Sequence, residues 1–107
     1  MKKQGALKEM EAKAFSSANI LKSWNLFELE CNSDKHLIGY CPSYGFDVIT
    51  PEIAVYEYDK KTKSGKAITR TGTIYELDGR PQRINPKGHL LLREFMEKHA
   101  SNIRFLN

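Results

Sequence analysis

The stretch from Ile53 to Leu77 constrains the fold most strongly, because it contains the longest run of strand-forming residues in the chain. Residues 53–58 are almost all apolar, aromatic or β-branched, and Pro51 precedes them, where a proline removes no hydrogen bond from a central ladder. Residues 67–71 and 73–77 have the same character. We therefore predict a central β-hairpin followed by one further strand.

The two strands of this central hairpin are joined by a polar, lysine-rich segment over residues 60–66, which contains the turn dipeptide Ser64-Gly65. A turn centred near Lys63 fixes the register of both strands. The cross-strand pairs that this turn predicts are Tyr56 with Arg70 and Tyr58 with Ile68.

The basic residues of the central hairpin have two interpretations. As a binding surface, the tip lysines and Arg70, with Tyr56 and Tyr58 on the adjoining strand, attract phosphate or an acidic partner. As a structural feature, the lysines keep an exposed tip hydrated and discourage edge-to-edge pairing of strands. The tip offers no aromatic ring for a base to stack on, which favours the structural interpretation.

A second basic group precedes and enters the last predicted helix. Arg80 and Arg83 follow the final strand, and Lys87 falls in the first turn of the helix, whose start carries a partial positive charge. This group keeps nucleic-acid binding open as an alternative to protein binding. The candidate binding residues of both groups are Lys60, Lys61, Lys63, Lys66, Arg70, Tyr56, Tyr58, Arg80, Arg83 and Lys87.

Two helices are predicted, one on each side of the strand-rich region. Residues 4–23 carry apolar side chains at steps of three and four, which is typical of an amphipathic helix that packs on a sheet or forms a dimer seam. Residues 86–100 carry a second apolar stripe. Asn85-Pro86 marks the start of this second helix, because asparagine caps helices and a proline at the first position loses no hydrogen bond.

A further hairpin is predicted over residues 26–41. Phe27, Leu29 and Cys31 alternate with acidic residues, and residues 32–35 form a cluster of turn-forming residues. The expected fold is therefore a single α+β domain over residues 1–107. In it, an antiparallel β-meander of about five strands is flanked by an N-terminal and a C-terminal helix.

Reactive side chains form no recognisable catalytic or metal-binding motif. Cys31, His36 and Cys41 follow a C-x4-H-x4-C spacing, but a turn at 32–35 would place the two sulfurs about 16 Å apart, at the usual rise of a strand. That separation argues against both a disulfide and a shared zinc ion. The sequence also contains no phosphate-binding glycine loop, dinucleotide-binding fingerprint or H-E-x-x-H. We expect no metal, no cofactor and no catalytic residue.

The length and the net charge of the chain limit where the protein can be located and which partners it can bind. A chain of 107 residues with 40% hydrophobic residues can bury one modest core. No apolar run approaches the ~18 residues of a membrane span, and Glu9 and Lys13 stand where a secretion signal needs an apolar stretch. We therefore expect a cytoplasmic protein without a membrane partner, either a monomer or a homodimer. A net charge of +4 permits nucleic-acid binding without arguing for it.

The segment T-R-T-G-T-I-Y-E-L over residues 69–77 resembles a T-R-[ST]-G-[ST]-x-Y-x-L strand motif. Small bacterial proteins encoded by prophages and other mobile elements carry this motif, and with Thr50-Pro51 the resemblance covers residues of about 50–77. Those proteins are mostly uncharacterised, so the resemblance implies no activity. It implies an accessory protein of a mobile element, which binds a host component.

These observations lead to one expected function, one main alternative and a third hypothesis, which is a small enzyme that would use Cys41, His89 and Asp47. The expected function is that of a small non-catalytic accessory protein that acts by protein–protein binding. Its particular form would be an inhibitor or modulator of a host system, encoded by a mobile element, with a host protein as partner. The alternative is a basic DNA- or RNA-binding accessory protein, whose affinity would fall steeply with salt.

Overall fold

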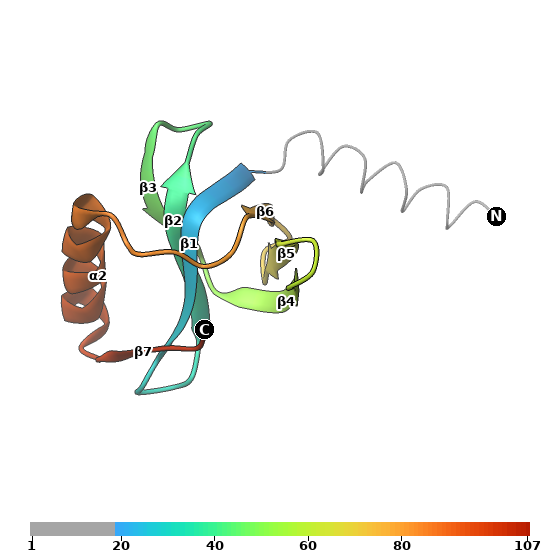
Figure 1. Cartoon of the computed structure of the whole chain (residues 1–107). Helices are drawn as coiled ribbons and strands as arrows, with labels where there is room; N and C mark the ends of the chain where they lie inside the picture. The colour runs from blue at the N-terminus through green and yellow to red at the C-terminus, as the bar shows by residue number, and fades with distance from the viewer. Residues whose placement is uncertain (1–18) are drawn as a thin grey trace.

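The computed structural model describes residues 19–107, which form a seven-stranded sheet and one helix (Figure 1). The strands are β1 (Asn19–Leu29), β2 (Lys35–Cys41), β3 (Phe46–Ile49), β4 (Ile53–Asp59), β5 (Ser64–Thr69), β6 (Ile74–Asp78) and β7 (Ile103–Phe105), and the helix is α2 (Pro86–His99). The strand order is β3-β2-β1-β6-β5-β4, and β7 pairs with β1 outside this path. All pairings are antiparallel except that of β1 with β6, so the sheet is mixed.

The predicted fold class is wrong. The described chain contains a mixed sheet of seven strands and a single C-terminal helix, instead of an antiparallel meander of about five strands between two helices. Residues 19–23, which were predicted to end the N-terminal helix, form the start of β1. The rest of that predicted helix, residues 4–18, lies outside the described residues. Pairing with β6 and burial of Leu21 override the helical spacing, because tertiary contacts routinely outweigh local preference.

β1 is the central strand, and it belongs to two parts of the sheet. Its first residues pair with β6, and its later residues pair with β2 on one side and β7 on the other. A bulge separates these parts, because the register against β2 shifts between Lys22 and Asn25 and Ser23 adopts a φ of 50°. The extra residue keeps Leu21 and Trp24 in the same core cluster although they are three positions apart.

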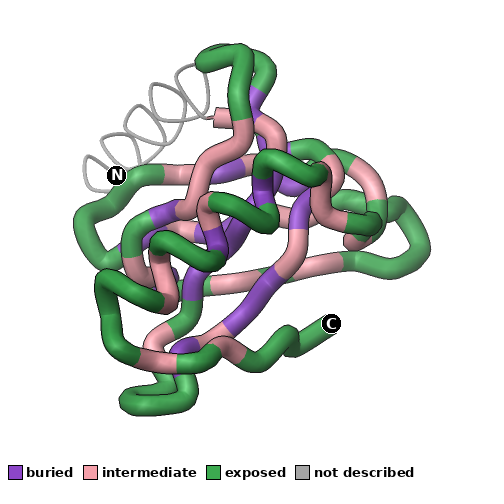
Figure 2. The backbone as a smooth tube through the Cα atoms, turned by 90° about the vertical axis from the view of Figure 1, so that its left-hand side faces the viewer, coloured by how far each residue is buried: buried purple, intermediate pink, exposed green. Residues whose placement is uncertain are grey.

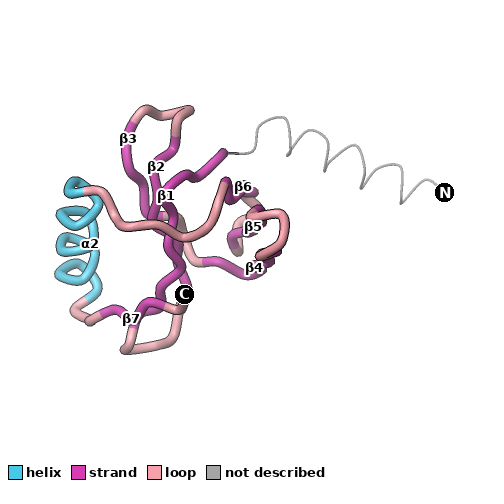
Figure 3. The backbone as a smooth tube through the Cα atoms, viewed as in Figure 1, coloured by secondary structure: helices cyan, strands magenta, loops and turns pink. Residues whose placement is uncertain are grey.

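The molecule has three layers around β1 and β2 (Figures 1 and 3). Helix α2 covers one face, where Phe27, Ile38 and Leu92 form a small buried cluster. Strands β4, β5 and β6 cover the other face, where the larger cluster is centred on Trp24. Buried residues accordingly follow the inner strands, while the turns are exposed (Figure 2).

The register of the central hairpin differs from the predicted one by three residues. Tyr56 pairs with Ala67 and Tyr58 with Gly65, instead of Arg70 and Ile68. The turn consists of residues 60–63, with Lys63 at a φ of 53°, so that Gly65 is not part of it. Gly65 is required for close packing, since a Cβ there would collide with the carbonyl oxygen of Glu57.

Helix α2 starts where the sequence signals place it, with Pro86 in its first turn and an extended Asn85 before it. The side chain of Asn85 does not cap the helix; its Nδ2 donates instead to Asp47 Oδ1 of β3, over 2.9 Å. Ala100 ends the helix in the left-handed conformation. In the described part of the chain, no helix is long and apolar enough to cross a membrane.

Candidate binding surfaces

The structure separates the basic residues that the sequence grouped on the central hairpin. Lys60, Lys61 and Lys63 lie in the exposed turn between β4 and β5. Arg70 follows the opposite end of β5, about six strand residues or roughly 20 Å from that turn. The tip lysines and Arg70 therefore do not form one continuous surface.

Arg70 forms an ion pair within the fold. Its Nε lies 2.7 Å from Glu52 Oε2, and its backbone N–H donates to the Glu52 carbonyl oxygen over 3.0 Å. The hydrogen bond from Arg70 lowers the pKa of Glu52, and the same bond raises the pKa of Arg70. Arg70 thus joins the β5–β6 turn to the segment before β4, which gives it a structural role.

Tyr56 and Tyr58 are half-buried and pack against the core. Both rings pack edge-on against Trp24, with centroid distances of 6.1 Å for Tyr56 and 5.2 Å for Tyr58. Burial raises the pKa of Tyr56, and the neighbouring Tyr58 adds to that shift. The three-residue difference in register also removes the predicted pairing of Tyr56 with Arg70, because Tyr56 pairs with Ala67 instead.

The Thr-Arg-Thr-Gly segment of the resemblance builds the turn between β5 and β6. Thr69 is buried, and its Oγ1 accepts a hydrogen bond from the backbone N–H of Thr73 over 3.0 Å. Gly72 has a φ of +94°, a conformation that favours glycine. Tyr75 and Leu77 then enter the core. In this chain, each of these residues has a structural role.

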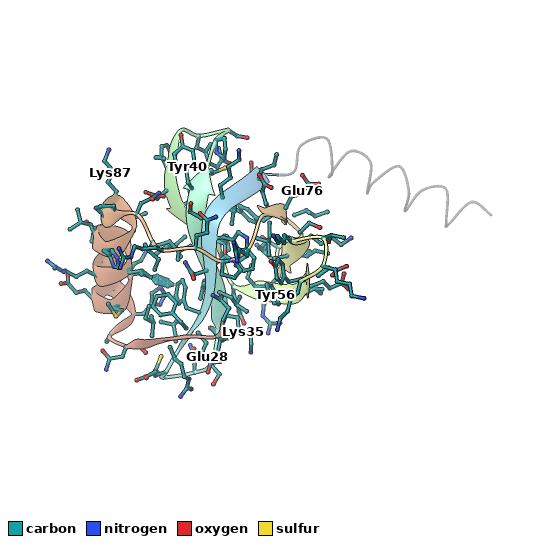
Figure 4. All side chains as sticks on the ribbon, viewed as in Figure 1. Glu28, Lys35, Tyr40, Tyr56, Glu76 and Lys87 are labelled. Atoms are coloured by element: carbon teal, nitrogen blue, oxygen red, sulfur yellow. The ribbon has the colours of Figure 1, made fainter. Side chains whose placement is uncertain are left out.

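The outer face of β4, β5 and β6 is mostly acidic. Lys66 stands between Glu57 and Glu76 on the neighbouring strands, as the register shows. A groove along this face is also lined by Asp59 and Asp78. Figure 4 shows Glu76 on this part of the sheet, away from α2. The carboxylates oppose the approach of a nucleic acid to the central hairpin.

Arg80, Arg83 and Lys87 remain exposed, and they follow the link from β6 to α2 that crosses β1 (Figure 1). Arg83 lines a groove whose other walls are the start of α2, β1 and the C-terminal strand. Lys87 projects outward from the start of the helix (Figure 4). These three predicted binding residues therefore share one accessible segment, as Lys60, Lys61 and Lys63 share the exposed turn between β4 and β5.

An exposed aromatic patch was not predicted. It consists of Tyr44, Phe46 and Leu90, which are 53%, 57% and 56% exposed. The two rings stack with centroids 5.7 Å apart and an angle of 16° between their planes. Phe46 and Leu90 both line a shallow groove between β3 and α2. In the sequence, this patch could have been inferred from Leu90, because it is an apolar residue that lies outside the predicted apolar stripe of the helix.

Cysteine and histidine side chains form no reactive centre among the residues that the structure describes. Cys31 is exposed in the β1–β2 turn, Cys41 is buried in the core, and both are free thiols. A turn at residues 32–35 would place Cys31 opposite His36, but in the structure His36 pairs with Phe27. Within residues 19–107, no group of three or more His, Cys, Asp or Glu side chains could hold a metal ion.

Three surfaces thus remain as candidates in the described part of the chain: the aromatic patch, the groove beside Arg83 and the acidic outer face of the sheet. Comparison with family models, with curated proteins and with solved structures finds no match to this chain. Function is therefore inferred from the chemistry of these surfaces.

Proposed function

We propose that the protein acts by binding another protein, without catalysis, through the aromatic patch of Tyr44, Phe46 and Leu90. The observation that carries this proposal is the stack of two half-exposed rings beside an exposed leucine. Single exposed apolar residues are common on protein surfaces, but adjoining ones mark interaction sites. Aromatic anchors contribute much of the binding free energy in protein interfaces.

The geometry of the patch favours affinity. Each ring limits the motion of the other, so that binding costs less side-chain entropy than it would for separate rings. Asp47, Lys87 and Glu94 border the groove between β3 and α2 and provide a polar rim of both signs. Such a rim favours a partner that combines an apolar side chain with charged neighbours.

The particular form of this function is a mobile-element protein that inhibits or modulates a host system. This form rests on the small size of the chain and on the motif resemblance over residues of about 50–77. The partner is then a host protein. The patch itself supports protein binding in general, and either a monomer or a homodimer could present it.

The proposal is tested by affinity capture from a bacterial lysate treated with nuclease. The bait is the full chain, either unchanged or with Phe46→Ser and Leu90→Ser together. Val55→Ser, which replaces a 43% exposed apolar residue on β4, is the matched control. A protein captured in stoichiometric amounts by the unchanged chain and the control, but lost with the double variant, supports the proposal. Equal capture by all three baits contradicts it.

Nucleic-acid binding is the second candidate, and the shared segment of Arg80, Arg83 and Lys87 favours it. Charge reversal at these residues should abolish binding of a labelled oligonucleotide, whereas reversal at Lys60, Lys61 and Lys63 should change it little. Affinity should fall steeply between low and physiological salt. If binding depends on the tip lysines, or if the affinity does not change with salt concentration, the segment of Arg80, Arg83 and Lys87 is not the interface.

A further inference from the structure

The groove beside Arg83 combines polar and apolar walls. Its volume is about 880 Å³, within the ~300–1,000 Å³ that is usual for small-molecule sites. Its lining residues are Asn25, Gln82, Arg83, Ile84, Pro86, His89, Phe105 and Asn107. They come from β1, the β6–α2 link, the first turns of α2 and the C-terminal segment. Four separate parts of the described chain therefore meet at this groove.

The amide oxygens around the groove are already engaged. Asn25 Oδ1 accepts from Asn107 Nδ2 over 3.0 Å, and Asn107 Oδ1 accepts from the backbone N–H of Leu26 over 2.6 Å. Gln82 Oε1 accepts from the hydroxyl of Ser23 over 3.4 Å. Two of the amide nitrogens are engaged as well, because Asn25 Nδ2 donates to the Gln82 carbonyl oxygen over 2.6 Å and Asn107 Nδ2 donates to Asn25. Each of the two asparagine amides therefore retains one N–H and one acceptor position, and Gln82 retains both of its N–H groups.

Arg83 and His89 add to this donor-rich character. A guanidinium has only donors, and Arg83 forms no ion pair among residues 19–107. No acidic side chain lines this groove, whereas acidic side chains line three other grooves of the described chain. A donor-rich groove without acidic side chains selects a ligand that is anionic and rich in acceptors.

Phe105 gives the groove an apolar wall. The ring is 45% exposed and is held edge-on by Phe27, with centroids 6.3 Å apart. Ile84 and Pro86 lie on the same groove. A planar ring in the ligand can stack on the exposed part of Phe105, and such stacking of a base on an aromatic side chain is favourable and tolerant of base identity.

We propose that this groove binds a nucleotide unit, with its phosphate at Arg83 and His89 and its base against Phe105. The N–H groups that Asn25, Gln82 and Asn107 retain are then available to the acceptors of the base or sugar. The same chemistry is offered by a free nucleotide and by one residue of a single strand. The inference is independent of the aromatic patch, and it deepens the nucleic-acid candidate by naming the unit that is bound.

The test is an NMR titration of the full ¹⁵N-labelled chain with AMP, with inorganic phosphate and with a short single-stranded oligothymidylate. Arg83→Gln removes the phosphate contact, and Phe105→Leu removes the ring but keeps an apolar contact with Phe27. Lys61→Gln makes the same charge change at the distant hairpin tip. Thermal unfolding of each variant shows whether the fold is retained.

We expect AMP to shift the resonances of Arg83, Phe105 and the three side-chain amides. AMP affinity should fall at least about tenfold with Arg83→Gln and about fivefold or more with Phe105→Leu, and stay within about twofold with Lys61→Gln. Inorganic phosphate should bind at least about fivefold more weakly than AMP. No shift at about 10 mM AMP, equal binding of phosphate and AMP, or equal loss with Lys61→Gln would overturn the proposal.

The oligonucleotide distinguishes the two sources of the ligand. Displacement of AMP by the oligonucleotide supports the groove as a site for a strand, and AMP binding without displacement supports it as a site for free nucleotide. An oligonucleotide that binds while AMP does not would reject the groove and still leave nucleic-acid binding elsewhere on the chain as a candidate function.

Discussion

The indole Nε1–H of Trp24 donates a hydrogen bond to the carbonyl oxygen of Gly79 over 3.0 Å. Trp24 follows the bulge of β1 and is fully buried, while Gly79 directly follows β6 at a φ of +77°. The two residues are 55 positions apart in the sequence. Their bond fixes the place where the link to α2 leaves the sheet and crosses β1.

Replacing Trp24 by phenylalanine should destabilise the fold by about 2–4 kcal/mol. The smaller ring leaves a cavity and removes the donor to the Gly79 carbonyl, so that both packing and a hydrogen bond are lost. Urea unfolding followed by circular dichroism measures the change. Tyr44→Phe, at an exposed ring, is the control and should stay within about 0.5 kcal/mol. Equal stability of Trp24→Phe and the unchanged chain would show that this contact is unimportant.

Gly65→Ala should destabilise the fold more than Gly72→Ala does. A Cβ at Gly65 meets the backbone of β4, which cannot move easily, and we expect a cost of about 1–3 kcal/mol. At Gly72 the space is open and only the positive φ opposes alanine, which costs about 1 kcal/mol. Thermal unfolding of both variants gives the order. The reverse order would mean that Gly65 acts as a turn residue, as the sequence first indicated.

Stability should decrease at alkaline pH, in part because of Tyr75. Burial raises the pKa of Tyr75 above 10.0 in the folded chain, and the proximity of Tyr44 and Cys41 raises it further. A raised pKa means that the neutral phenol is stabilised by folding. Its contribution is complete below pH 10 and is lost as the pH rises through the folded pKa. Urea unfolding of Tyr75→Phe between pH 8 and about 11 should show a shallower decline than the unchanged chain; parallel declines would contradict this assignment.

The pKa of Glu52 should rise when Arg70 is replaced by glutamine. The hydrogen bond from Arg70 is the main cause of the lowered pKa of Glu52 in the folded chain. A lowered pKa contributes stability that is present above about pH 4.5 and is lost as the pH falls through the folded pKa. NMR titration of the Glu52 carboxyl carbon gives the value directly. Lys61→Gln is the control, and an unchanged Glu52 pKa in Arg70→Gln would disprove the ion pair in solution.

The parts of the fold that depend on local chemistry could be predicted from the sequence. Asn85-Pro86 locates the start of α2, and the alternation after Leu26 indicates the second half of β1. The start of β1 could not be found in this way. The bulge at Ser23 places buried Leu21 and Trp24 three positions apart, a spacing that also fits a helix. Pairing of β1 with β6 depends on contacts between distant residues, which no local pattern records.

The candidate surfaces were predictable only in part. Arg80, Arg83 and Lys87 were found because exposed charge is visible in the sequence. The role of Arg70 was missed, since its partner Glu52 lies beyond the hairpin. The aromatic patch was missed because Phe46 and Leu90 are far apart in the chain and meet only through packing of α2 on β3.

The two-part pairing of β1 has a consequence for synthesis of the chain. One edge of β1 is covered by β6 and β7, both of which leave the ribosome long after β1 does. Until then, the backbone N–H and C=O groups along that edge of the nascent chain are unpaired. An unpaired strand edge can pair with a strand of another chain, and such pairing leads to aggregation. Closing such long loops also makes folding slow. Protection of this edge during translation, rather than the stability of the finished fold, should therefore limit the yield of native protein.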